Sequence, residues 1–171
     1  PFYLQKIYDV EYKRLLSYEA NILKHFDASI IISNADKALI PTTNSDEIST
    51  IRNGVNFDYF KPIPDTVKEF DLVFTGNMSY PPNVTAVLYL HNEILPLLKL
   101  QKPDIRILIA GANPISKIKE LHASNFVITG WVEEINEFYT KSKIFIAPML
   151  IGTGLQNKLL EAIAMQLPCI T

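Results

Sequence analysis

The sequence predicts an α/β protein built around a doubly wound parallel sheet. From residue 69 onward, five short apolar runs alternate with helix-like segments, which is the pattern of repeated strand–helix units. The runs are apolar almost without interruption, as in strands that are buried on both faces. Parallel strands need long crossovers, and right-handed crossovers place helices on both faces of such a sheet.

The chain opens with an amphipathic helix, because apolar residues recur with a 3.6-residue period over residues 3–26. After it we expect, in order, a buried strand, a short helix and a further strand at 27–33, 34–40 and 48–52. Ser33 or Asn34 suits the N-cap of the short helix, since both side chains accept hydrogen bonds from free backbone N–H groups.

Residues 55–64 contain two prolines and three aromatic residues without a helix or strand period, so we interpret them as an ordered linker. We therefore expect the tail end of one domain and its linker at 1–64, and a second domain at 65–171. The chain starts directly in a helix and ends on a strand, and we interpret both domains as truncated.

The second part carries the repeated units. We expect its strands at 70–76, 105–111, 126–130, 143–148 and 168–171. We expect its helices at 82–100, 115–122, 133–141 and 154–166. Pro82 suits the first turn of its helix, because the missing N–H would have no helical partner there.

The composition excludes several classes of protein. The net charge of -2 without a basic patch argues against binding of duplex nucleic acid. A single cysteine rules out an intrachain disulfide, and no apolar run approaches the ~18 residues of a membrane span. Motifs for nicotinamide, P-loop, nucleophile-elbow and metal sites are missing from the sequence. We expect a cytoplasmic protein without a metal or cofactor.

The most informative stretch is 151–171, where a glycine turn precedes a helix. A helix that opens after Gly152 and Gly154 offers unpaired N–H groups and the positive end of its dipole, which favours an anion. Lys158 and Glu161 follow on one polar face of this helix. Cationic groups at one end and a carboxylate one turn further along suit a nucleotide, which has phosphates and ribose hydroxyls. The alternative is an ordinary i,i+3 ion pair on a solvated face.

Ligands of open parallel sheets bind beyond the carboxyl ends of the strands. The loops to inspect are therefore 76–79, 111–113, 130–132 and 148–154. Gly76 and Gly130 equally suit plain strand-end turns. Trp131 suits a packing role or a position at the edge of a nucleobase.

Several motifs together resemble one known family. Phe74-Thr-Gly-Asn-Met, Val127-Ile-Thr-Gly-Trp-Val, Ile146-Ala-Pro-Met-Leu and Gly152-Thr-Gly-Leu-Gln-Asn-Lys-Leu-Leu-Glu-Ala-Ile-Ala-Met are similar to the C-terminal domain of a family 4 (group 1) glycosyltransferase of the GT-B fold. Asn53-Gly-Val-Asn-Phe-Asp-Tyr-Phe-Lys-Pro resembles the segment that joins the two domains of that fold. The resemblance implies a nucleotide-sugar donor, linked to UDP or GDP, and transfer with retention of configuration.

The resemblance also implies roles for residues of the final helix. Glu161 would hold the ribose hydroxyls, with Leu160 and Ala162 flanking it near the nucleotide. Lys158 and the glycine turn would neutralise the diphosphate. Thr153 stands where many relatives carry a first glutamate, which sets this chain apart at the donor sugar.

The remaining implied contacts come from the strand-end loops. Gly130, Trp131 and Val132 would edge the base, and Gly76 would let its loop approach the phosphates. We expect transfer of a sugar to a glycan or lipid-linked acceptor, with peripheral membrane contact through the missing part of the first domain. The isolated chain should be inactive, because that part would hold the acceptor. Alternatives are a nucleotide-sugar 2-epimerase of the same fold and the non-catalytic half of a split transferase.

Overall fold

The computed structural model describes residues 2–41, 47–151 and 156–171. The described residues form two compact units, one up to Asn53 and the other from Gly54 onward. The sequence suggested a boundary near residue 65, whereas residues 54–64 group with the second unit. Within that stretch Phe60 packs against the core of the second unit.

The first unit begins with the long helix α1 (Phe2–Ile22), which continues as a 3₁₀ turn, η1 (Leu23–His25). Strands β1 (Ser29–Ile31) and β2 (Ile48–Thr50) pair in parallel, and the short helix α2 (Asn34–Lys37) lies between them in sequence. Ser33 caps α2 by accepting a hydrogen bond from the amide of Asp36 at 3.0 Å. Among the described residues, no helix is both long and apolar enough to cross a membrane.

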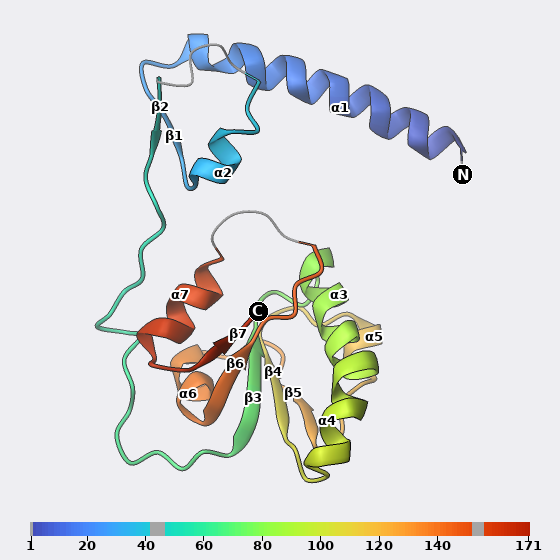
Figure 1. The fold of residues 1–171 in the computed structure, drawn as a ribbon, viewed down its shortest axis with the longest axis vertical. Coiled ribbons are helices and arrows are strands. Elements are labelled where there is room, and N and C mark those ends of the chain that lie inside the picture. The colour runs from blue at the N-terminus through green and yellow to red at the C-terminus, as the bar shows by residue number, and fades with distance from the viewer. Residues whose placement is uncertain (1, 42–46, 152–155) are drawn as a thin grey trace. The chain divides into compact units, whose positions relative to one another are not determined.

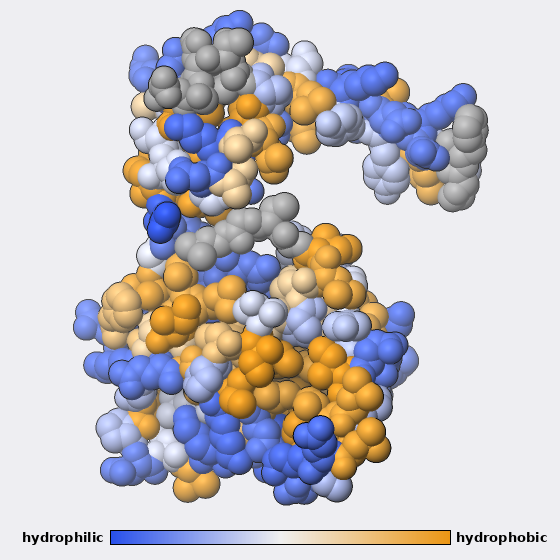
Figure 2. All heavy atoms as spheres, viewed as in Figure 1, coloured by the Kyte–Doolittle hydropathy of each residue, from blue (hydrophilic) through white to orange (hydrophobic). Residues whose placement is uncertain are grey.

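The helix predicted at the start of the chain is present, and the described residues leave its apolar side chains largely uncovered. Ile7 and Leu15 are each 54% exposed, and Tyr8 is 70% exposed. Figure 2 shows hydrophobic side chains interspersed with hydrophilic ones along this helix. Such a surface is typical of a helix that packs against further protein.

The second unit has a five-stranded sheet in the order β5-β4-β3-β6-β7, with every pair parallel. Its strands are β3 (Phe70–Thr75), β4 (Ile107–Ala110), β5 (Phe126–Ile128), β6 (Ser142–Ile146) and β7 (Cys169–Ile170). Its helices are α3 (Pro81–Tyr89), α4 (Leu95–Gln101), α5 (Ser116–Lys119), α6 (Ile135–Thr140) and α7 (Asn157–Ala164). Helices α3 to α5 lie on one side of the sheet and α6 and α7 on the other (Figure 1). The predicted doubly wound α/β fold is confirmed.

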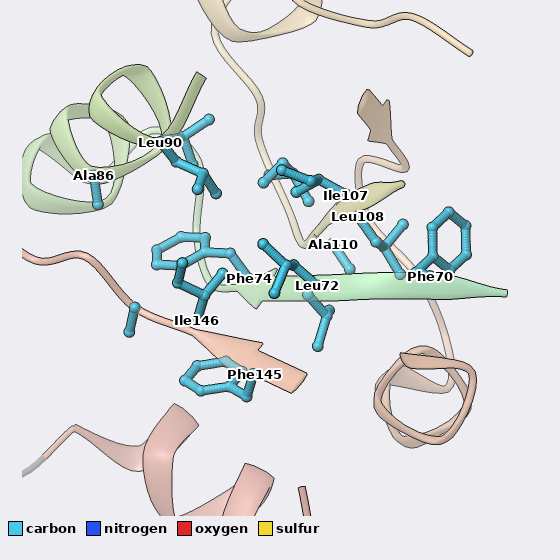
Figure 3. Close-up of a cluster of buried hydrophobic side chains, with 14 of the residues drawn as sticks. Phe70, Leu72, Phe74, Ala86, Leu90, Ile107, Leu108, Ala110, Phe145 and Ile146 are labelled. Carbon is cyan, nitrogen blue, oxygen red and sulfur yellow. The ribbon is translucent and has the colours of Figure 1, made fainter. Parts of the chain in front are cut away.

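The core of the second unit lies between the sheet and its helices. Phe74 of β3 and Phe145 of β6 are completely buried, and Phe74 lies beside Ile146 (Figure 3). The central strands are buried on both faces, which explains their continuous apolar sequence.

The single helix predicted at 82–100 is interrupted by a wider π turn, η3 (Leu90–Ile94), between α3 and α4. The amide of Leu95 bonds to the carbonyl of Leu90, five residues earlier. Pro96 follows at once, and a proline in a regular helix would clash with the carbonyl four residues before it. The wider turn is a recognised way for a helix to continue through such a position.

Candidate functional site

The order of strands reverses between β3 and β6, whose outgoing helices cover opposite faces of the sheet. In open α/β sheets a crevice forms at the carboxyl ends of such a strand pair. The loop after β3 starts at Gly76, and helix α7 follows the loop after β6. Residues at the start of α7 therefore belong to this end of the sheet.

The wall of this region is made of backbone. Gly76 and Gly111 have φ angles of +152° and +144°, which suit glycine alone. A Cβ on Gly111 would overlap the carbonyl oxygen of Gly76. The amide of Met78 bonds to Ala112 at 2.8 Å, and the amide of Gly111 bonds to Gly130 at 3.1 Å. Hydrogen bonds between main chains thus join the loops that follow β3, β4 and β5.

Lys158 of α7 lies half-buried beside the loop after β3. Its ammonium donates a hydrogen bond to Oδ1 of Asn83 at 2.6 Å and lies 4.4 Å from the ring centre of Phe74. Burial lowers the pKa of Lys158 to about 8, although the charge of Glu161 acts in the opposite direction. An anion placed at this ammonium would replace the lost hydration and favour the charged form.

Asn83 connects the loop after β3 to helix α7. Its side chain is 5% exposed, and its Nδ2 donates to the carbonyl of Asn77 at 2.9 Å while Oδ1 accepts from Lys158. A Cβ on Gly76 would lie 2.7 Å from Nδ2 of Asn83 and 3.5 Å from Nζ of Lys158. Gly76 therefore keeps the space beside this amide and ammonium open.

Glu161 is held by a different set of groups. Its Oε2 accepts a hydrogen bond from the hydroxyl of Tyr139 at 2.8 Å, and that hydroxyl lies 2.6 Å from Oγ1 of Thr75. Burial, followed by the charge of Glu161, raises the pKa of Tyr139. Lys158 and Glu161 thus bond to separate partners and are half-buried, unlike an ion pair on a solvated face.

The other residues that the sequence singled out have varied surroundings. Leu160 is half-buried next to Glu161, whereas Ala162 is fully buried in the core. Three further positions, Gly152, Thr153 and Gly154, lie outside the described residues.

The residues that follow β5 are separated from β3 by strand β4. Gly130 has a φ of +74°, Trp131 is 72% exposed and Val132 is half-buried. A cavity of about 300 Å³ lies beside them, lined by Pro114, Lys119, His122, Ile128, Thr129 and Gly130. The structure therefore groups Gly76, Lys158 and Glu161, and it places 130–132 at a separate loop along the same edge.

Sequence reasoning missed Thr75, Asn83 and Tyr139. Thr75 carries a signal in the sequence, because it is a polar residue at the end of an apolar strand just before a glycine. Asn83 and Tyr139 carry none, since their partners Lys158 and Thr75 lie 75 and 64 residues away in the sequence.

Comparisons with known proteins match this chain along most of its length. A relative from Klebsiella pneumoniae, described as an uncharacterized 44.6 kDa protein in the cps region, is 29% identical over 180 residues. The match covers 90% of this chain and 46% of the relative, so the chain spans about half the length of the curated relative it matches.

Solved structures share the fold. A glycosyltransferase from Rickettsia africae superposes with a TM-score of 0.65 at 23% identity, covering 90% of this chain and 46% of that one. HepE from Anabaena, solved with UDP and glucose, gives a TM-score of 0.69 at 15% identity and the same coverage of both chains. HepE has also been solved with UDP-glucose. The parallel sheet thus corresponds to part of a GT-B glycosyltransferase.

The family model described as "Glycosyl transferases group 1" matches residues 69–171. This range contains the whole five-stranded sheet, together with Lys158, Glu161 and the residues that hold them. The chain belongs to the group 1 glycosyltransferase family.

Proposed function

We propose that the second unit is the donor-binding domain of a retaining glycosyltransferase that uses a nucleotide sugar. The observation that carries this proposal is the pair Lys158 and Glu161, a cation and a carboxylate that separate partners hold apart at the switch point of the sheet. A diphosphate needs the first group, and ribose hydroxyls suit the second. The family match supports this assignment.

In this proposal Lys158 neutralises the diphosphate together with Gly152, Thr153 and Gly154. Charge builds up on the departing diphosphate during transfer, so a fixed cation there stabilises the transition state more than the ground state. Gly76 lets the phosphates approach the loop after β3.

Glu161 binds the ribose, with Leu160 and Ala162 as its neighbours in α7. In the same proposal the nucleobase lies with one edge against Gly130, Trp131 and Val132. Because HepE binds UDP, we propose a UDP-linked sugar as the donor, with a GDP-linked sugar as the alternative.

We also propose that residues 1–64 are the tail of the N-terminal domain and its linker. The uncovered apolar side chains of α1 support this, because a complete domain would bury them. The acceptor would be a glycan or a lipid-linked sugar. The relative from a cps region supports a role in polysaccharide synthesis.

Isothermal titration calorimetry of the full chain with UDP and with GDP tests the donor site. We expect binding of one of them, and a loss of about 10-fold or more in Lys158→Met and in Glu161→Gln, because each removes a hydrogen bond to a charged group. Lys99→Met and Glu93→Gln make the same changes at exposed positions and should bind like the wild type. No binding at millimolar nucleotide, or unchanged affinity in both site variants, would overturn the proposal.

A further inference from the structure

We propose that Tyr139 is a positioning residue for Glu161, fixing this carboxylate so that one of its oxygens is presented to a ribose hydroxyl. The inference rests on the proposed function of the site. Three residues from three elements carry it: Thr75 at the end of β3, Tyr139 in α6 and Glu161 in α7.

The chemistry of these groups sets the direction of the hydrogen bonds. A carboxylate only accepts, so the single proton of the Tyr139 hydroxyl points to Oε2 of Glu161, 2.8 Å away. The tyrosine oxygen is then free to accept, and Thr75 donates to it over 2.6 Å. The chain of donors runs from Thr75 through Tyr139 to Glu161. A tyrosine hydroxyl is protonated at neutral pH, and burial raises the pKa of Tyr139 further.

The tyrosine ring has no freedom to move its hydroxyl. Tyr139 is completely buried, and its ring lies 6.1 Å from that of Phe60 and 5.9 Å from that of Phe145, centre to centre. Thr75 is 3% exposed. A rigid donor of this kind holds Oε2 of Glu161 before a ligand arrives, so less side-chain freedom is lost on binding.

The arrangement leaves one oxygen of Glu161 for a ligand. Within the described parts of the chain, the hydrogen bond to the Glu161 side chain comes from Tyr139 and engages Oε2 only. Oε1 therefore keeps its capacity to accept from a ribose hydroxyl. Lys158 lies one turn earlier in α7, and its ammonium donates its hydrogen bond to Asn83.

The test compares ribose recognition between variants of the full chain. Calorimetry measures the affinity for UDP, 2′-deoxy-UDP and 3′-deoxy-UDP, with the GDP series used if the wild type prefers GDP. We expect the wild type to prefer the ribonucleotide over at least one deoxy analogue by about 10-fold, the factor for one hydrogen bond. Tyr139→Phe should lower the affinity for the ribonucleotide and leave the affinity for that analogue unchanged, so that the preference disappears.

Three further variants complete the series. Thr75→Val removes the hydroxyl that donates to Tyr139 and should reduce the preference, whereas Thr75→Ser keeps the hydroxyl and should restore it. Tyr59→Phe is the matched control, because the hydroxyl of Tyr59 interacts with Glu134 and not with Glu161. It should bind all three nucleotides like the wild type.

The outcomes separate the two proposals. A wild type that binds neither UDP nor GDP overturns the proposed function. A wild type that binds with a ribose preference, which Tyr139→Phe retains, leaves the proposed function intact and overturns the positioning role. If thermal unfolding shows that Tyr139→Phe does not fold, the comparison of Thr75→Val with Thr75→Ser decides. Equal ribose preference in those two variants overturns the inference.

Discussion

Raising the pH from 7 to 9 should weaken nucleotide binding because it removes the charge of Lys158. The ammonium of this residue is half-buried between Asn83 and Phe74, and burial lowers its pKa to about 8. The protonated form therefore predominates below pH 8, and the affinity that depends on it is lost as the pH rises through 8. An ordinary exposed lysine would keep its charge throughout this range.

The size of the effect follows from the pKa of about 8 in the free protein. The protonated fraction of Lys158 falls from about 0.9 at pH 7 to about 0.09 at pH 9. If a bound diphosphate keeps the ammonium protonated, the apparent dissociation constant scales with the inverse of this fraction. We expect about a 10-fold weaker affinity for UDP at pH 9 than at pH 7, with most of the change above pH 8.

Calorimetric titrations of UDP at half-unit pH steps measure this curve, and Lys158→Arg is its control. An arginine stays protonated at these pH values, so the variant should bind with an affinity that hardly changes between pH 7 and 9. A flat curve for the wild type would refute the assigned role of Lys158. A curve of equal slope in Lys158→Arg would refute it as well, because the titrating group would then lie elsewhere.

Alanine substitutions at four glycines should change the free energy of unfolding in a fixed order, measured by urea unfolding. Gly54→Ala should be neutral or slightly stabilising, and Gly130→Ala should cost about 1–2 kcal/mol because of its positive φ. Gly76→Ala should cost more because its Cβ meets Asn83, and Gly111→Ala should cost most because its Cβ meets backbone. Any other order would contradict the geometry. Asn83→Ala should lower the free energy of unfolding by about 1–3 kcal/mol and also weaken UDP binding, because the carbonyl of Asn77 and the ammonium of Lys158 both lose a hydrogen-bond partner. Wild-type affinity in a folded Asn83→Ala protein would argue against a role of the Asn83–Lys158 hydrogen bond in binding. Burial raises the pKa of Asp71, but hydrogen bonds from Lys143 and the amide of Arg106, with the charges of Lys143 and Lys102, outweigh it and lower the pKa overall. The stabilisation from Asp71 is therefore present at neutral pH and is lost as the pH falls through its pKa in the folded protein. Asp71→Asn should be less stable than the wild type at pH 7, and this difference in the free energy of unfolding should shrink towards pH 2. A constant difference would exclude the interactions of Asp71 with Lys143, Arg106 and Lys102 as its cause.

The architecture of the second unit could be predicted because its signals are local and repeated. Buried parallel strands read as apolar runs, and each predicted strand overlaps an observed one. Helix ends were predicted less well. The final helix was expected at 154–166 and its described part is Asn157–Ala164, since the last turns depend on capping contacts that propensity does not reveal.

The candidate site shows the same difference between local signals, which the sequence reveals, and long-range contacts, which it does not. Lys158 and Glu161 could be found because both lie on one face of one helix, at a spacing visible in the sequence. Their partners could not, since the buried hydroxyl of Tyr139 and the amide of Asn83 come from other elements. Only the folded sheet brings β3, α6 and α7 together. Polar residues that serve a site through another residue are in general hidden from a single sequence.

The contact between Gly76 and Gly111 has a consequence for divergence among relatives. Main chain meets main chain there with no side chain between them, so the contact requires glycine at Gly111 but involves no other side chain of these loops. Under the proposed function, exchanges at exposed positions such as Asn77 and Trp131 would change the side chains offered to a donor while this main-chain contact stays as it is. Side chains around this contact can therefore vary without a change in the backbone beneath them.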